Sequence, residues 1–162
     1  MNRPVTNAET GQKDEYWMRQ ALQQAEQAAG LEEVPVGAVI VLNGEIIGRG
    51  YNRPVTSNDP SAHAEIASIR DAAAHQNNYR LPGSVMYVTI EPCAMCAGAL
   101  IHARIARLVF GTAEPRAGAV VSRNNLLDAD YNNHKVVYSG GVLQAQCETL
   151  IQDFFRSRRL AR

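Results

Sequence analysis

The dipeptide Asn43-Gly44 stands between two short apolar runs and constrains the fold more than any other local feature. The run Val36–Leu42 precedes it and Ile46-Ile47 follows, and both runs are rich in β-branched residues. Asn-Gly in this position is a strong signal for a two-residue β-hairpin, because both central residues of the favoured turn need a positive φ. The sequence therefore predicts an antiparallel pair of strands in the first third of the chain.

Patterns typical of helices and of strands alternate along the rest of the chain. Helices are predicted over Asp14–Gly30, about Ser61–His75, Ala94–His102 and a C-terminal stretch that contains Leu143, Cys147, Leu150, Ile151 and Phe154. Strands are predicted over Val85–Ile90, Arg107–Phe110 and Val136–Tyr138, and loops over Tyr51–Pro60 and Thr112–Ala119. A hairpin followed by strand–helix–strand units predicts an α/β fold in which a mixed sheet carries helices on its faces.

Length and composition indicate one globular domain. The 162 residues are enough for a single core and too few for two, and 46% apolar with 20% charged residues excludes extensive disorder. Residues 1–12 are polar and without periodicity, so they are expected to form a flexible arm before a domain over residues 13–162. No apolar run approaches the ~20 residues that span a bilayer, and no secretory signal is visible. A cytoplasmic protein without membrane contact is expected.

The balance of charges limits the ways in which the chain could bind nucleic acid. Sixteen basic and sixteen acidic residues give a formal net charge of zero, so any attraction to nucleic acid must come from local patches. The clear basic cluster near the C-terminus is formed by Arg156, Arg158, Arg159 and Arg162, the last of which lies outside the residues described below. These arginines could bind RNA phosphates, or they could be a solvated helix end whose cations complement the helix dipole. The residues themselves favour neither interpretation.

Two of the three cysteines point to a metal site. Cys93 and Cys96 lie in Pro92-Cys93-Ala94-Met95-Cys96 at an expected helix N-terminus, where the helix dipole and free amides favour thiolates. Thiolates select zinc among the abundant metals, but two ligands are not enough. His63, also at an expected helix start, is the best third ligand. A zinc site of this kind leaves one coordination position open, as catalytic zinc sites do.

Glu65 lies two residues after His63 and is therefore near the metal without needing to bind it. Water at an open zinc position has its pKa lowered towards ~7. A nearby carboxylate can take a proton from this water and deliver it to a leaving nitrogen. The predicted reaction is hydrolytic attack at an electrophilic carbon. A Cys-x-x-Cys segment alone could instead be a redox pair, so the combination with His63 and Glu65 carries the interpretation.

The order His63-Ala64-Glu65 and then Pro92-Cys93-Ala94-Met95-Cys96 resembles the zinc-dependent nucleobase deaminase superfamily. Longer segments are similar to the bacterial tRNA-specific adenosine deaminases, and they span the chain from Asp14 to Arg159. These segments are Glu33–Val39, Tyr51–Pro54, Asp59–Ile66, Glu91–Ala99 and Asp153–Arg159. The resemblance implies a three-layer, cytidine deaminase-like fold with a mixed five-stranded sheet flanked by helices.

The same resemblance implies a homodimer with one zinc ion per subunit and no organic cofactor. It implies conversion of adenosine to inosine at the wobble position of a tRNA anticodon, chiefly of an arginine tRNA. By position, Asn52 matches a family residue that hydrogen-bonds the flipped base, and the backbone amide of Ala64 lines the same pocket. Glu114 stands in a loop near the RNA, where familiar members commonly carry aspartate. Arg53, beside Asn52, is a candidate contact to phosphate or sugar.

Two other functions remain open at this point. Free-base and mononucleotide deaminases, which act on guanine, cytosine or deoxycytidylate, share both zinc segments but do not need the three C-terminal arginines. An RNA-binding module with a structural zinc ion would need a fourth protein ligand and would give Glu65 no role. The anticodon stem-loop of a tRNA is the partner that the resemblance favours.

Overall fold

A computed structural model of the chain describes residues 3, 4 and 6–161 and contains one mixed sheet. Its strands are β1 (Gly37–Leu42), β2 (Glu45–Tyr51), β3 (Val85–Ile90), β4 (Arg107–Thr112) and β5 (Val137–Gly140). Their order in the sheet is β2-β1-β3-β4-β5. β1 is antiparallel to both of its neighbours, whereas β3, β4 and β5 are parallel to one another.

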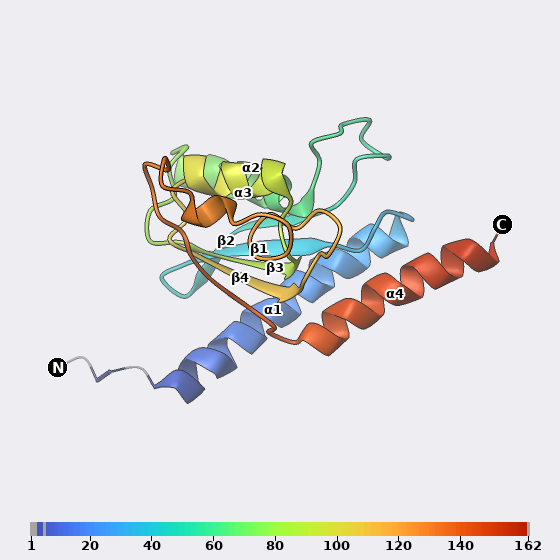
Figure 1. The fold of residues 1–162 in the computed structure, drawn as a ribbon, viewed down its shortest axis with the longest axis horizontal. Coiled ribbons are helices and arrows are strands. Elements are labelled where there is room, and N and C mark those ends of the chain that lie inside the picture. The colour runs from blue at the N-terminus through green and yellow to red at the C-terminus, as the bar shows by residue number, and fades with distance from the viewer. Residues whose placement is uncertain (1–2, 5, 162) are drawn as a thin grey trace.

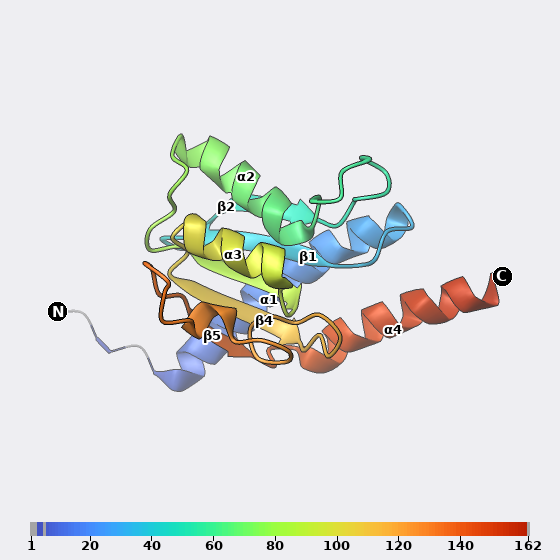
Figure 2. The same cartoon turned by 45° about the horizontal axis from the view of Figure 1, so that its top comes forward.

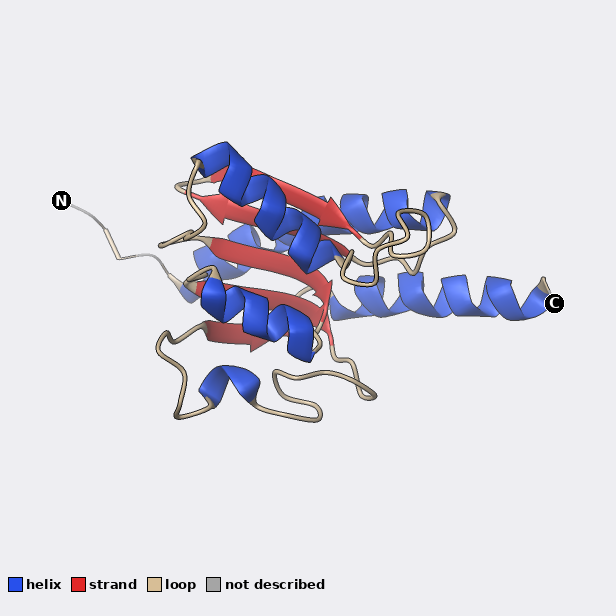
Figure 3. Cartoon of the chain, turned by 90° about the horizontal axis from the view of Figure 1, so that it is seen from above, coloured by secondary structure: helices blue, strands red, loops and turns tan. Residues whose placement is uncertain are grey.

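Helices cover both faces of this sheet, which gives three layers (Figure 1). The helices are α1 (Asn7–Gly30), α2 (Ala64–Gln76), α3 (Ala94–His102) and α4 (Gln144–Leu160), with a short 3₁₀ turn, η1 (Leu126–Asp128). Seen from above, α2 and α3 lie in front of the sheet, and α1 and α4 lie behind it (Figure 3). The predicted three-layer fold with a mixed five-stranded sheet is confirmed.

Side chains that alternate along the central strands build two cores, one on each face of the sheet. On β1, Ala38 and Ile40 pack toward α2 and α3, whereas Val39 and Val41 pack toward α1. β3 and β4 repeat the alternation with Met86, Val88, Leu108 and Phe110 in the first core and Tyr87 and Val109 in the second. Because both faces of these strands are buried, their sequences are continuous apolar runs.

The predicted hairpin and the elements around the cysteine pair agree with the structure. Asn43 and Gly44 have φ angles of 51° and 77°, as a tight turn between β1 and β2 requires. β3 and α3 have the predicted bounds. β4 continues to Thr112, two residues beyond its predicted end, because its last residues still pair with β3. β5 is shifted toward Gly140.

The N-terminal helix begins at Asn7, whereas the sequence analysis placed its start at Asp14. Thr6 and Glu9 form a capping box: the amide of Glu9 donates to the Thr6 hydroxyl at 3.1 Å, and the amide of Thr6 donates to the Glu9 carboxylate at 2.9 Å. Residues 7–12, expected to belong to a flexible arm, are therefore helical. Residues 1, 2 and 5 of that predicted arm lie outside the described residues.

The second helix begins at Ala64, three residues after its predicted start. The carboxylate of Asp59 accepts hydrogen bonds from the amide and the hydroxyl of Ser61, at 2.9 and 2.7 Å. These bonds keep the backbone before Ala64 out of the helix, so that His63 becomes the N-cap residue with an extended backbone (φ −78°, ψ 153°). The N-cap position decides the direction in which the His63 side chain can point.

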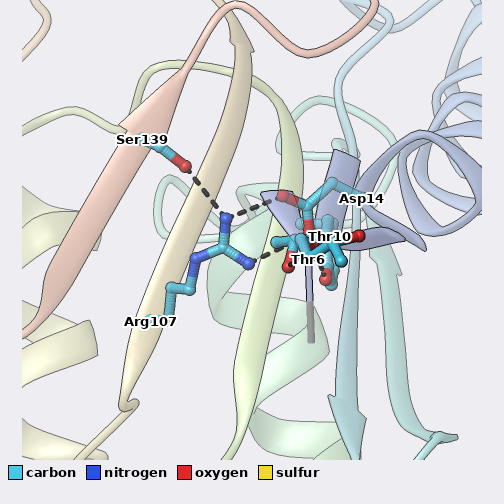
Figure 4. A network of polar contacts seen from close by, with 6 residues as sticks. Thr6, Thr10, Asp14, Arg107 and Ser139 are labelled. Atoms are coloured by element: carbon cyan, nitrogen blue, oxygen red, sulfur yellow. Dashed lines mark hydrogen bonds and ion pairs between the residues drawn. The ribbon is translucent and has the colours of Figure 1, made fainter. Parts of the chain in front are cut away.

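A buried ion pair joins α1 to the sheet (Figure 4). Arg107 of β4 donates two hydrogen bonds to the carboxylate of Asp14, at 3.0 and 2.7 Å, and the Tyr87 hydroxyl donates a third at 2.8 Å. Arg107 also donates to the hydroxyl of Ser139 in β5 at 3.2 Å. The Asp14 carboxylate thus connects α1 directly to β3 and β4, and Arg107 extends the network to β5.

Replacing Asp14 with alanine should destabilise the fold, since Arg107 and Tyr87 would lose a buried partner. We expect the free energy of unfolding to fall by about 3 kcal/mol, measured by urea denaturation followed by circular dichroism. Glu15→Ala is the matched control, because Glu15 contacts Arg19 at 3.6 Å on the exposed side of the same helix, and its loss should cost below about 1 kcal/mol. Equal losses in the two variants would contradict the anchoring role of Asp14.

Candidate active site

The N-termini of two helices meet on the same face of the sheet, where α2 and α3 lie side by side (Figure 2). His63 is the N-cap residue of α2 and Cys93 is the N-cap residue of α3. Neither side chain makes a capping hydrogen bond. Both side chains are therefore free to turn toward each other.

A glycine in β2 allows α2 to lie close enough to the sheet for this meeting. A Cβ atom at Gly50 would lie 2.4 Å from the carbonyl oxygen of Ala64 and 2.5 Å from the amide nitrogen of Ser68. Real Cβ atoms do not approach so closely. Any larger residue at Gly50 would therefore push the first turn of α2, and His63 with it, away from the sheet.

Three side chains from the two helix starts form a group that fits a zinc ion. His63 Nδ1 lies 3.6 Å from Cys93 Sγ and 3.5 Å from Cys96 Sγ, and all three ligand atoms lie within 4.8 Å of one another. Two sulfur atoms and one imidazole nitrogen are a donor set that zinc prefers. Hydrogen bonds from Cys96 and His63 lower the pKa of the Cys93 thiol to about 4, which favours the thiolate that binds metal.

Glu65 lies in the first turn of α2 and is 2% exposed. Burial raises the pKa of its carboxyl group to about 6. Within the described part of the chain, its Oε1 atom has no hydrogen-bond partner. A buried polar atom without a hydrogen-bond partner lowers the stability of the fold, and such atoms are rare in folded proteins. The charges of the nearby Cys93 and His63 side chains act on this carboxyl group, which makes Glu65 a candidate for proton exchange with a water molecule or a substrate.

The loop after β2 brings two of the predicted substrate-binding groups together. Asn52 is half-buried, and its Oδ1 accepts a hydrogen bond of 2.8 Å from the backbone amide of Ala64. The backbone amide of the next residue, Arg53, donates to the carbonyl of Ala62 at 3.1 Å. The guanidinium group of Arg53 lies 5.5 Å from the ring centre of Tyr51 and is exposed. This loop is thus tied to the segment that carries His63.

The C-terminal arginines separate into two groups. Arg156 and Arg159 line a groove of about 700 Å³ that Glu114 lines from the other side. Arg158 instead donates a hydrogen bond to the carbonyl of Glu32 after α1, and its guanidinium group lies 5.0 Å from the ring centre of Phe154. The structure therefore brings Arg156 and Arg159 to the Glu114 loop and does not bring Arg158 there.

Two buried acidic residues were given no role by the sequence analysis. Glu33 is 3% exposed and accepts hydrogen bonds from the amide of Val55 (3.3 Å) and from the amide and hydroxyl of Thr56 (both 2.8 Å). Glu91 is 2% exposed and binds the loop after β4. The available signal was an acidic residue one or two positions before a proline, close to the start or end of a buried strand, in Glu33-Val34-Pro35 and Glu91-Pro92.

The chain is similar to known deaminases in sequence. Residues 11–112 match the family model of the cytidine and deoxycytidylate deaminase zinc-binding region. A tRNA-specific adenosine deaminase of Haemophilus influenzae is 47% identical over 147 residues, which is 90% of this chain and 85% of that protein. A tRNA-specific adenosine deaminase of Bacillus subtilis is 41% identical, over 91% of each chain.

The likeness extends to structure. A solved structure from work on A-to-I editing by tRNA:A34 deaminases at the wobble position of transfer RNA has a TM-score of 0.81 and 41% sequence identity. It covers 83% of this chain, and this chain covers 98% of it. The region that matches the family model contains both segments of the candidate zinc site. The chain belongs to the cytidine and deoxycytidylate deaminase family and, within it, to the tRNA-specific adenosine deaminases.

Proposed function

We propose that this chain deaminates adenosine to inosine at the wobble position of a tRNA anticodon, with an arginine tRNA as the expected substrate. The observation that carries the proposal is that a Glu65 oxygen near His63, Cys93 and Cys96 has no hydrogen-bond partner among the described residues. Relatives that are 47% and 41% identical, and that carry the name tRNA-specific adenosine deaminase, support the choice of substrate.

His63, Cys93 and Cys96 would hold the zinc ion, and Glu65 would move protons during the reaction. When bound, the ion supplies Lewis acidity that lowers the pKa of water in the site. Glu65 takes a proton from this water molecule while the water oxygen adds to the carbon that bears the amino group of adenine. The carboxyl group then gives a proton to the ring nitrogen and assists transfer of a second proton to the amino group. The carbon–nitrogen bond breaks, ammonia leaves, and the base becomes hypoxanthine.

Asn52, held in place by the backbone amide of Ala64, would orient the base. The oxygen of the Asn52 side chain is occupied by the Ala64 amide, so the nitrogen of the side chain is the end that can donate to a ring nitrogen of the base. The adenine must leave the stack of the anticodon loop to reach Glu65. An unpaired base makes this extrusion cost a few kcal/mol at most.

The groove between the Glu114 loop and α4 would receive the RNA backbone. Arg156 and Arg159 are exposed in this groove and can each bind a phosphate. The exposed Arg53 is a further candidate on the loop that carries Asn52. Arg158 contacts Glu32 and Phe154, so we expect its contribution to RNA binding to be smaller.

The family pattern leads us to propose a homodimer that meets its tRNA in the cytoplasm. No helix in the part of the chain that the structure describes is both long and apolar enough to cross a bilayer. Sedimentation equilibrium should give twice the mass of one 17.7 kDa chain. A mass of 17.7 kDa at micromolar concentration would contradict the dimer.

Replacing Glu65 with glutamine should abolish turnover and leave the zinc content unchanged, since glutamine keeps the shape but cannot carry the proton. We expect inosine formation in an anticodon stem-loop RNA to fall by about 10²-fold or more, measured by mass spectrometry of the digested RNA. Glu45→Gln in the exposed hairpin is the matched control and should behave as the parent. Full inosine formation by Glu65→Gln would overturn its role as the proton carrier, and zinc-loaded parent protein that binds the RNA without forming inosine would favour a non-catalytic zinc module.

The parent protein in the same assay separates the proposed function from its nearest rival. Zinc-loaded protein that deaminates guanine or cytosine, but neither the stem-loop nor full-length tRNA, would be a free-base deaminase. The proposal requires the opposite preference.

Removing Arg156 or Arg159 should weaken RNA binding and leave the reaction step intact. The logarithm of the association constant for RNA falls linearly with the logarithm of the salt concentration. For each arginine replaced by alanine, this negative slope should become shallower by about 0.7 to 1, measured by fluorescence anisotropy of a labelled stem-loop. Arg19→Ala is the control, because Arg19 is exposed on α1 and lies outside the groove. An unchanged salt slope in both groove variants would rule out phosphate binding there.

A further inference from the structure

The carboxylate of Glu91 accepts hydrogen bonds from both ends of the loop that follows β4. The backbone amides of Glu114, Val120, Val121 and Ser122 donate to it at 3.0, 3.1, 2.9 and 3.0 Å, and the Ser122 hydroxyl donates a fifth hydrogen bond. These donors come from both ends of residues 113–122, here called the β4 loop. One side chain from outside this loop therefore fixes where the loop begins and where it returns.

The β4 loop lies directly against this carboxylate. A Cβ atom at Gly118 would lie 2.4 Å from Glu91 Oε2 and 2.5 Å from Oε1. The backbone adds two further ties, since the amide of Ala119 donates to the carbonyl of Pro92 and the amide of Glu91 donates to the carbonyl of Thr112, both at 2.9 Å. The loop is thus wrapped around the Glu91-Pro92 segment, immediately before the zinc ligand Cys93.

All five groups that contact the Glu91 oxygens are hydrogen-bond donors. A carboxylate accepts all of them, whereas a glutamine amide would point N–H bonds at some of these donors. The side chain is buried, so water cannot replace the lost partners. The arrangement is therefore built for a carboxylate, and glutamine should release part of the β4 loop.

The β4 loop connects this carboxylate to the RNA groove. Glu114 donates its backbone amide to Glu91 and lines the groove together with Arg156 and Arg159. We propose that Glu91 is a positioning residue for RNA recognition, which holds the β4 loop at a fixed place relative to the zinc-ligand segment. This inference rests on the proposed function, because it takes the groove as the place where the RNA lies.

The test measures RNA binding and turnover separately. Glu91→Gln should raise both the Kd and the KM for the anticodon stem-loop about tenfold or more. The kcat at saturating RNA should stay within about threefold, with zinc content per chain unchanged. Ser122→Ala removes one donor of the five and should raise the Kd by a smaller factor. Glu45→Gln is the control for the change of charge.

A second variant tests the same proposal if Glu91→Gln fails to fold. Gly118→Ala places a methyl group against the same carboxylate and should also raise Kd and KM. Gly30→Ala is its control, because a Cβ atom at Gly30 meets nothing within 4 Å. Lower thermal stability with unchanged Kd and KM would contradict the proposal, because Glu91 would then only stabilise the fold. Loss of zinc with a fall in kcat would also overturn the proposal, since Glu91 would then act on the ligands.

Fluorescence anisotropy of the labelled stem-loop measures RNA binding separately from deamination. A failure of this proposal can therefore be told apart from a failure of the proposed function. If the parent binds the stem-loop without deaminating it, the proposed function fails, and the Kd ratios still decide the role of Glu91. If the parent neither binds nor deaminates RNA, both proposals fail.

Discussion

The meeting of two helix N-termini at one place on the sheet is the constraint on which the site depends. His63 and the cysteine pair are far apart in sequence, yet His63 Nδ1 lies 3.5 Å from Cys96 Sγ. This requires α2 to lie almost in contact with β2, which a side chain larger than hydrogen at Gly50 would prevent. It also requires α3 to start directly after the buried strand β3. The fold brings these three side chains together, where they would hold the ion.

Buried acidic residues hold polar segments in place in several parts of the fold. Asp14 joins α1 to the sheet, Glu33 holds the loop after Asn52, and Glu91 holds the β4 loop, each by several donated hydrogen bonds. Glu65 is equally buried but has an oxygen with no partner among the described residues. Glu65 therefore differs from the other buried carboxylates of the described residues, and this difference supports our proposal that it moves protons.

Local signals allowed much of the fold and the centre of the site to be predicted. The Asn43-Gly44 turn, β3 and α3 agree with the sequence analysis because short-range patterns decide them. The start of α1 was predicted wrongly although the Thr6–Glu9 capping box is visible in the sequence. The contact of Arg158 with Glu32 and the bonds of the β4 loop to Glu91 could not be predicted, because they depend on how distant segments pack.

The reaction that we propose for this site is a hydrolysis in which water replaces the amino group of a wobble adenosine. Mass spectrometry of an anticodon stem-loop incubated with the zinc-loaded protein in ¹⁸O-labelled water tests this reaction directly. We expect inosine at the wobble position that carries the heavy oxygen at the former amino carbon, with one ammonia released for each inosine. Unchanged adenosine, or inosine without the label, would contradict it.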